Sequence, residues 1–187
     1  MTEKKDTWWD ALRFAVILLA IIIPFRLFIA QPFIVHGQSM DDTFHQNDYL
    51  IVDELSYLFR NPERGEVVIF KNPLNNSQYF IKRIIGLPGE TVNVVNGKVT
   101  IIQPGKGRFT LDEPYLGSDN QKDAYRKLGV DEYFVMGDNR QVSWDSRYWG
   151  ALKQEKIRGR AFLRLFPFSK VAYLPGLAHY ANDINNQ

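Results

Sequence analysis

The stretch TVNVVNGKVTII, residues 91–102, predicts a β-hairpin. Two runs rich in β-branched residues, 91–95 and 98–102, flank the dipeptide Asn96-Gly97. Asn-Gly favours the two-residue turns whose positive φ angles match the twist of paired strands. Branched side chains also pack well on a pleated sheet. The hairpin therefore predicts antiparallel β structure in the middle of the chain.

Similar runs extend from the hairpin in both directions. Branched and aromatic residues dominate 49–54, 66–71, 79–85, 132–136 and 160–166, and turn signals such as Gly86-Leu-Pro-Gly89 separate these runs. Residues 120–128 are predicted to form a short helix on an insertion. No internal repeat or low-complexity tract divides this region, so residues 32–187 are predicted to form one mainly β domain.

The composition is that of a folded chain without cysteine. Of the 187 residues, 45% are hydrophobic, and 23 basic against 21 acidic residues give a net charge of +2. The basic residues are scattered, whereas a nucleic-acid partner usually requires a concentrated basic patch. The lack of cysteine excludes disulfides and cysteine-ligated zinc, and His36, His45 and His179 lack the spacing of a metal motif. The composition therefore predicts no nucleic-acid partner and no metal site.

Residues 14–30, FAVILLAIIIPFRLFIA, are apolar apart from Arg26 and predict a membrane-spanning helix. Their length is near the lower limit for crossing a bilayer, about 17 residues. Trp8 and Trp9 suit a membrane–water interface, and Arg26 can extend its charge to the headgroups. A cleavable secretory signal is the alternative, but the small-x-small site that it needs is poorly matched around Ala30. We therefore predict a retained anchor in residues 1–31.

Basic residues set the predicted orientation of this anchor. Lys4, Lys5 and Arg13 precede the span, and no Lys or Arg occurs between Arg26 and Arg60. Positive residues beside a span favour the cytoplasmic side. The N-terminus is therefore predicted in the cytoplasm, and residues 32–187 outside, next to the lipid bilayer.

Three segments concentrate unusual residues, and the first is VHGQSM at residues 35–40. Gly37 permits close approach of the backbone, and Met40 supplies an apolar anchor beside Ser39. A lone serine is most often a turn residue. At a position just beyond the predicted span, however, Ser39 would meet a membrane-embedded substrate where it emerges.

The second segment is YFIKRIIGLPG, residues 79–89. On a strand, Phe80, Lys82 and Ile84 share one face and Arg83 points to the other. The two apolar neighbours would desolvate Lys82 and lower its pKa from the reference value of about 10.4. A neutral lysine can then act as a general base. The alternative is a lysine whose stem packs while its amine reaches water.

The third segment is MGDNRQVSWDSRYWG, residues 136–150, which is too polar for a strand and too aromatic for a flexible linker. One interpretation is an ordered loop tied by Asp–Arg pairs and side-chain-to-backbone hydrogen bonds. Another is a carboxylate site for metal or glycoside chemistry at Asp138 and Asp145. Arg140 and Arg147 would compete for these carboxylates, which favours the ordered loop.

Together these segments resemble the signature boxes of the bacterial signal peptidase I (leader peptidase) family. An apolar anchor, GQSM, YFIKRIIGLPGE, GDNRQVSWDSRYWG and IRGRAFLRLFPF follow one another in that order, and the resemblance runs from residue 11 to residue 170. It implies a mainly β, signal-peptidase/LexA-like catalytic domain with one N-terminal transmembrane helix. It also implies a location in the bacterial cytoplasmic membrane, crossed once, with the catalytic domain on the outer face.

The resemblance implies roles for individual residues. Ser39 matches the family's nucleophile and Lys82 its general base, so that a Ser–Lys dyad works without cofactor or metal. The backbone N–H of Ser39 would contribute to the oxyanion hole. The positions that match supporting residues are Ser143, which orients the lysine ammonium, Asp145 and Arg147, which brace the site, and Asp138 and Arg83, which form an ionic contact.

The implied function is removal of signal peptides from exported preproteins, which would be the partners of this chain together with the bilayer. The family cuts after small residues, commonly alanine at the first and third positions before the bond, because its substrate pockets are small. Phe33, Val35 and Ile81 match positions that line these pockets.

One position departs from the family's usual Ser-Met-x-Pro-Thr pattern. Here the stretch reads Ser39-Met-Asp-Asp-Thr43, with Asp42 where proline is usual. Proline would fix the backbone after the nucleophile. The aspartate is expected to loosen this turn, or to bring negative charge near Lys82 and so oppose a lowered lysine pKa.

Three other functions would use these residues differently. A self-cleaving Ser–Lys repressor of related fold would need a DNA-binding helical module where this chain has a predicted span. A Ser–His hydrolase would use His36 or His45 and would keep its activity without Lys82. A membrane-anchored, non-catalytic domain that binds exported chains would show no turnover.

Overall fold

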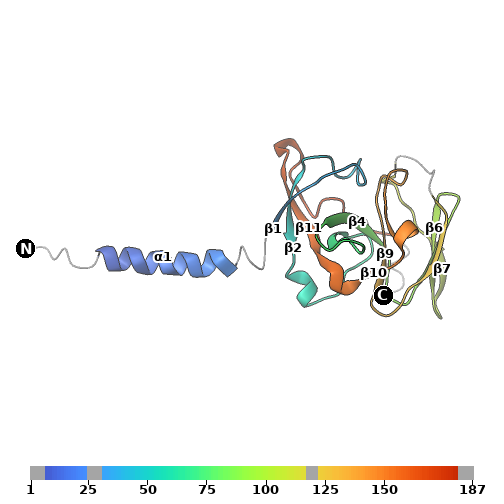
Figure 1. Cartoon of the computed structure of the whole chain (residues 1–187), viewed down its shortest axis with the longest axis horizontal. Coiled ribbons are helices and arrows are strands. Elements are labelled where there is room, and N and C mark those ends of the chain that lie inside the picture. Colours follow the sequence, from blue (N-terminus) through green and yellow to red (C-terminus); the bar gives the residue numbers. More distant parts are fainter. Residues whose placement is uncertain (1–6, 25–30, 117–121, 181–187) are drawn as a thin grey trace, which may run out of the picture.

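The computed structural model describes residues 7–24, 31–116 and 122–180, and it arranges their strands in two antiparallel sheets (Figure 1). Within these residues the larger sheet has eight strands in the order β1-β2-β11-β3-β4-β9-β10, with β12 paired to β11. Its strands are β1 (Gln31–Ile34), β2 (Tyr49–Asp53), β3 (Val67–Lys71), β4 (Tyr79–Gly86), β9 (Glu132–Met136), β10 (Leu152–Lys153), β11 (Ile157–Phe166) and β12 (Ala172–Tyr173).

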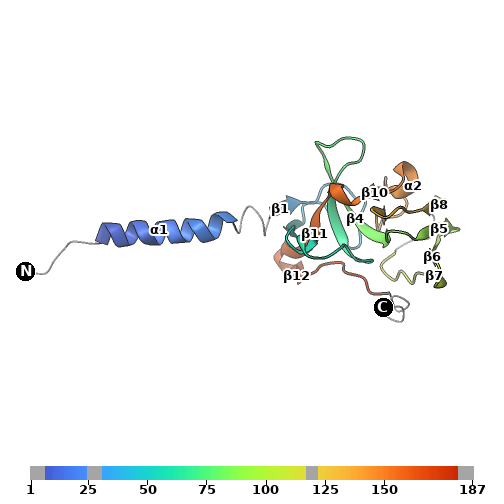
Figure 2. The same cartoon turned by 90° about the horizontal axis from the view of Figure 1, so that it is seen from below.

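The second sheet lies at the end of the molecule away from the N-terminal helix (Figure 2). Its order is β7-β6-β5-β8, and its strands are β5 (Thr91–Val95), β6 (Lys98–Gln103), β7 (Gly107–Thr110) and β8 (Ala124–Lys127). Short helical turns occur at η2 (Ser56–Leu58), α2 (Ser146–Trp149), η3 (Gln154–Lys156) and η4 (Phe168–Lys170). The prediction of a mainly β fold is therefore confirmed.

The hairpin predicted around Asn96-Gly97 is confirmed. β5 and β6 pair with Thr91 opposite Ile102 and Val95 opposite Lys98, and the two turn residues have φ angles of 48° and 80°. One face of the hairpin is fully buried and packs in a core cluster with residues of β9: Val92, Val94, Val99, Ile101, Phe134 and Met136. This shared cluster joins the second sheet to the first.

The helix predicted over residues 120–128 is wrong where the structure describes it. Residues 117–121 lie outside the described residues, and Ala124–Lys127 form strand β8, which pairs with β5. Three of the four β8 side chains are exposed, so the segment has no apolar stripe with which a helix could pack. As a strand it covers the edge of β5 that would otherwise present unpaired N–H and C=O groups.

Strands β1, β7, β10 and β12 were not predicted from the sequence, and all four are short. β1 holds Pro32, which lacks a backbone N–H and argues against a central strand. The structure places β1 at the edge of the larger sheet, where it pairs only with β2 among the described strands. Proline is tolerated in an edge strand because the outer side of that strand has no neighbouring strand, so no backbone N–H is needed there for a hydrogen bond.

Helix α1 (Thr7–Pro24) extends away from the sheets, and its side chains from Trp8 to Ala20 are exposed (Figure 1). Within the described part of the chain, no helix combines the length and apolar character that a membrane crossing requires. The span predicted from the sequence, residues 14–30, includes residues 25–30, which lie outside the described residues.

Candidate active site

Ser39 and Lys82, which are 43 residues apart in sequence, meet in the structure. Ser39 lies in the loop between β1 and β2, and Lys82 lies on β4. The Lys82 Nζ atom donates a hydrogen bond of 2.6 Å to Ser39 Oγ and one of 2.9 Å to the carbonyl oxygen of Ile81. Lys82 is only 4% exposed, so its amine does not reach bulk water as a surface lysine would.

Burial lowers the pKa of Lys82 from 10.5 to about 8. The charges of Asp145 and Asp138 act in the opposite direction, and the charge of Arg147 adds to the lowering. Desolvation therefore outweighs two nearby carboxylates. A lysine with this pKa is neutral in about one molecule in ten at pH 7, which is enough for a general base.

The loop that carries Ser39 is anchored by apolar side chains and by the segment after β9. Met40 and Phe44 are buried in a core cluster beneath the loop, together with residues of β2, β3 and β11. The Ser39 carbonyl oxygen accepts a hydrogen bond of 3.1 Å from the N–H of Asn139. The N–H of Ser39 itself donates no hydrogen bond within the described residues, so it is available to a bound substrate.

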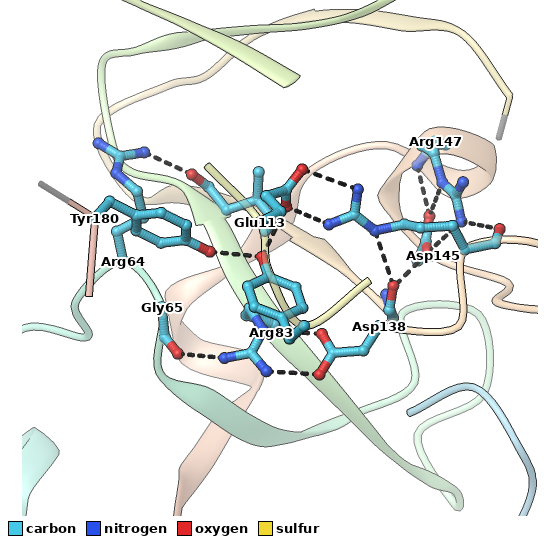
Figure 3. A network of polar contacts seen from close by, with 12 residues as sticks. Arg64, Gly65, Arg83, Glu113, Asp138, Asp145, Arg147 and Tyr180 are labelled. Atoms are coloured by element: carbon cyan, nitrogen blue, oxygen red, sulfur yellow. Dashed lines mark hydrogen bonds and ion pairs between the residues drawn. The ribbon is translucent and has the colours of Figure 1, made fainter. Parts of the chain in front are cut away.

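An ion pair between Arg83 and Asp138 lies next to this loop (Figure 3). Arg83 Nε and Nη2 donate to the two carboxylate oxygens of Asp138 at 2.8 and 2.6 Å, and both side chains are almost fully buried. Asp138 Oδ2 also accepts a bond of 2.6 Å from the hydroxyl of Thr43. The pair thus connects the residue after Lys82 to the loop that follows Ser39.

A second buried ion pair orders the 137–147 loop. Arg147 Nε and Nη2 donate to the Asp145 carboxylate, both at 2.8 Å, and Asp145 Oδ2 accepts a bond of 3.0 Å from the N–H of Gly137. Asp145 also caps the short helix α2, because its side chain accepts from the N–H of Arg147. The interpretation of residues 136–150 as a loop tied by Asp–Arg pairs is confirmed.

The hydroxyl of Ser143 is buried beside the site. Its Oγ atom has no hydrogen bond to any described residue, and the Lys82 amine donates to Ser39 and to the Ile81 carbonyl instead. The role expected for Ser143, orienting the lysine ammonium, stays a prediction.

A cleft of about 530 Å³ opens beside Ser39 and Lys82. Phe33, Val35 and Ile81, the three positions expected to meet substrate, all line this cleft. Sequence reasoning did not identify Tyr79 and Trp144, which also line it and are about half exposed. The cleft walls are mostly apolar, as is usual for sites that bind a ligand.

The described residues do not form the alternative sites, which were a Ser–His pair and a carboxylate site for metal or glycoside chemistry. His36 lies in the cleft wall, but its ring faces Gln46, and the Ser39 hydroxyl is paired with Lys82. Asp138 and Asp145, considered for metal or glycoside chemistry, are each engaged by an arginine. Residues 7–24, 31–116 and 122–180 contain no group of three or more His, Asp or Glu side chains suited to hold a metal ion.

A buried network that includes two residues after β7 reaches the 137–147 loop, and no motif predicted it (Figure 3). Glu113 forms an ion pair with Arg140, and Arg140 Nε donates to the carbonyl oxygen of Gly137 at 3.1 Å. The hydroxyl of Tyr115 donates to Glu113 at 2.7 Å and lies 2.6 Å from that of Tyr180. These partners are far apart in sequence, and only the fold brings them together.

Asp42 does not act as its sequence position suggested. Its φ angle is 78°, a left-handed conformation that proline cannot adopt, and its side chain is exposed. The carboxylates that raise the pKa of Lys82 are those of Asp145 and Asp138. The expected effect of Asp42 on the charge of Lys82 is therefore wrong, and the expected loosening of this turn stays a prediction.

The chain is similar to several known proteins. The chain matches the family described as signal peptidase, peptidase S26, over residues 8–166. It is 40% identical to a probable signal peptidase I-2 of Synechocystis over 92% of this chain and 80% of that protein. It is 35% identical to a signal peptidase I of Bacillus licheniformis over 91% of this chain and 98% of that protein. It also aligns with a crystal structure of a signal peptidase I from Enterococcus faecalis, at 32% identity, covering 54% of this chain and 97% of the other, with a TM-score of 0.47.

Proposed function

The chain belongs to the signal peptidase family, peptidase S26, and we propose that Ser39 is its nucleophile and Lys82 its general base. Membership makes the protein a serine protease, a hydrolase of peptide bonds, and supports a function in signal peptide removal. The observation that carries the proposal is the 2.6 Å contact between Ser39 Oγ and the amine of a lysine whose pKa burial lowers to about 8. A serine hydroxyl needs such a base to become nucleophilic.

The reaction follows from these two side chains. The neutral amine of Lys82 accepts the proton of Ser39 Oγ, which attacks the carbonyl carbon of the scissile bond. The Ser39 N–H is a donor for the oxyanion that forms. Protonated Lys82 then gives its proton to the leaving nitrogen as the C–N bond breaks. Water, deprotonated by Lys82, hydrolyses the remaining ester and restores Ser39.

The cleft supports a preference for small residues before the cut, of the Ala-x-Ala type. Phe33, Val35 and Ile81 line it together with Leu50 and Ile69, and these side chains belong to or pack against one apolar cluster. In an extended peptide alternate side chains point the same way, so the first and third residues before the bond would face this surface together. Large side chains there would have to displace well-packed residues, which is costly.

The two buried ion pairs support a bracing role. Arg83–Asp138 ties the strand of Lys82 to the loop of Ser39, and Asp145–Arg147 fixes the turn next to both. A displacement of about 1 Å at a catalytic group can cost on the order of 100-fold in rate. We therefore assign these four residues to holding the dyad, rather than to chemistry.

We also propose that residues 1–31 anchor the protein once in the bacterial cytoplasmic membrane, with residues 32–187 on the outer face. The apolar run 14–30 and the basic residues Lys4, Lys5 and Arg13 before it support this topology. An anchor would keep the site beside membrane-held preproteins and raise their effective concentration. Protease protection of an N-terminal tag in sealed vesicles tests the proposal: an N-terminus accessible from the outer face would overturn it.

Cleavage of a preprotein with an Ala-x-Ala site tests the dyad. The detergent-solubilised wild type should cut at that site, and Ser39→Ala and Lys82→Ala should not. Folding of both variants is checked by circular dichroism. Normal cleavage by Lys82→Ala would refute the mechanism. A folded wild type that binds the preprotein without cutting it would favour the non-catalytic binding domain.

A further inference from the structure

The side chain of Gln46 holds the backbone two residues before Ser39. Its Oε1 atom accepts a hydrogen bond of 2.7 Å from the N–H of Gly37, and its Nε2 atom lies 3.4 Å from Nδ1 of His36. We propose that Gln46 is a positioning residue for the nucleophile, and that its amide fixes the backbone of residues 36–38. The inference rests on the proposed function of Ser39 and adds a residue that no motif of the sequence identified.

The part of the loop that leads into Ser39 has few other contacts, one of which is a hydrogen bond of 3.2 Å from the Asp41 N–H to the Gln38 carbonyl oxygen. The loop is closed at its base by backbone hydrogen bonds, from Asn47 N–H to the Val35 carbonyl at 2.9 Å and from Val35 N–H to the Asp48 carbonyl at 3.0 Å. Beyond this base, residues 36–38 are exposed. A Cβ atom added to Gly37 would have no described atom within 4 Å, so no packing supports the backbone on that side.

The conformation of Gly37 makes this support important. Its φ angle of +89° lies in the region that favours glycine, and glycine leaves that region easily because it has no Cβ atom. A rotation there changes the direction of the next peptide groups, including the N–H of Ser39. Gln46 holds the observed conformation by occupying the Gly37 N–H. Because the Gly37 N–H already donates to Gln46, it is the Ser39 N–H that can donate to the oxyanion.

The expected effect is on turnover. One neutral hydrogen bond contributes about 1 kcal/mol, so loosening this segment should lower kcat by about five- to tenfold. Because the Gln46 side chain is exposed, its loss should leave the melting temperature nearly unchanged. A merely structural role would give the opposite pattern, a lower melting temperature with kcat preserved.

Two variants of the full chain separate the contacts. Gln46→Met keeps the length of the side chain but removes donor and acceptor, whereas Gln46→Glu keeps an oxygen that can accept from the Gly37 N–H. Kinetics with an Ala-x-Ala peptide should be measured near pH 9.5, above the Lys82 pKa of about 8, so that a new charge does not alter the protonation of the base. We expect the Met variant to lose five- to tenfold in kcat with KM within about twofold. The Glu variant should stay within about twofold of wild type, and equal losses in both variants, or none in either, would overturn the proposal.

Amide hydrogen exchange at Gly37 provides a readout that does not depend on cleavage. Exchange should be faster in Gln46→Met than in wild type and should return toward wild type in Gln46→Glu. Unchanged exchange in the Met variant would show that Gln46 does not hold this backbone. If the wild type failed to cleave at all, the proposed function would fail, and the exchange data would still decide the role of Gln46.

Discussion

The rate of cleavage should rise with pH around a midpoint set by Lys82. At the unperturbed pKa of 10.5, about one lysine in 3,000 would be neutral at pH 7, whereas at a pKa of about 8 the fraction is about one in ten. Burial therefore enlarges the population of active base by about 300-fold at neutral pH. Since only the neutral amine can take the Ser39 proton, kcat/KM should increase by about 50-fold between pH 6 and pH 8 and level off above pH 9.

The assay is steady-state cleavage of an Ala-x-Ala peptide in buffers from about pH 6 to pH 10 at constant ionic strength. The melting temperature of the protein across the same range serves as the control for unfolding. A midpoint that stays near pH 8 when His36 and His45 are replaced would assign the titration to Lys82. A rate that is independent of pH over this range would refute the reasoning, and so would a midpoint near pH 10, because burial would then not be supplying a neutral base.

Substitutions at three positions test the frame around the dyad. Asp138→Ala leaves the buried guanidinium of Arg83 without its carboxylate and should lower the free energy of unfolding by about 3–5 kcal/mol, measured by denaturant titration. Asp42→Gly should raise that free energy by up to about 1 kcal/mol, because glycine accepts the left-handed conformation without strain, whereas Asp42→Pro should lower it; equal stability of the two variants would contradict the φ angle of 78°. Gly137→Ala places a Cβ atom against the Ser39 carbonyl oxygen, so it should reduce both cleavage rate and melting temperature, and an unaffected enzyme would show that this close approach does not matter.

Local patterns in the sequence were sufficient to predict the strands that form the centre of the fold. The β5–β6 hairpin follows from Asn96-Gly97 and its flanking branched residues, and β9 has the predicted bounds. Short edge strands such as β1 carry little pattern of their own. β8 is a strand because β5 offers it an edge, and that information lies about 30 residues away in the chain.

In the candidate site, too, the sequence indicated some residues and missed others. The resemblance to signal peptidase motifs pointed to Ser39 and Lys82, and the structure brings these two side chains into contact. It did not indicate Glu113, Tyr115 or Gln46, whose contacts depend on where separate loops meet. Polar side chains in loops have no periodicity, so a sequence gives no sign of which distant partner satisfies each one.

Charged groups of the two buried ion pairs also affect the pKa of Lys82. The lowered pKa means that burying Lys82 costs about 3 kcal/mol of folding free energy below pH 8, a cost that disappears as the pH rises toward 10.5, because the unfolded chain binds the proton more tightly. An unpaired carboxylate beside the amine would remove that cost by keeping it protonated, and the base would then be lost at neutral pH. Asp138 and Asp145 are instead paired with Arg83 and Arg147, and the charge of Arg147 acts with burial to lower the pKa of Lys82. The two carboxylates can therefore order the loops of the site while Lys82 remains able to lose its proton, because burial outweighs the effect of their charges.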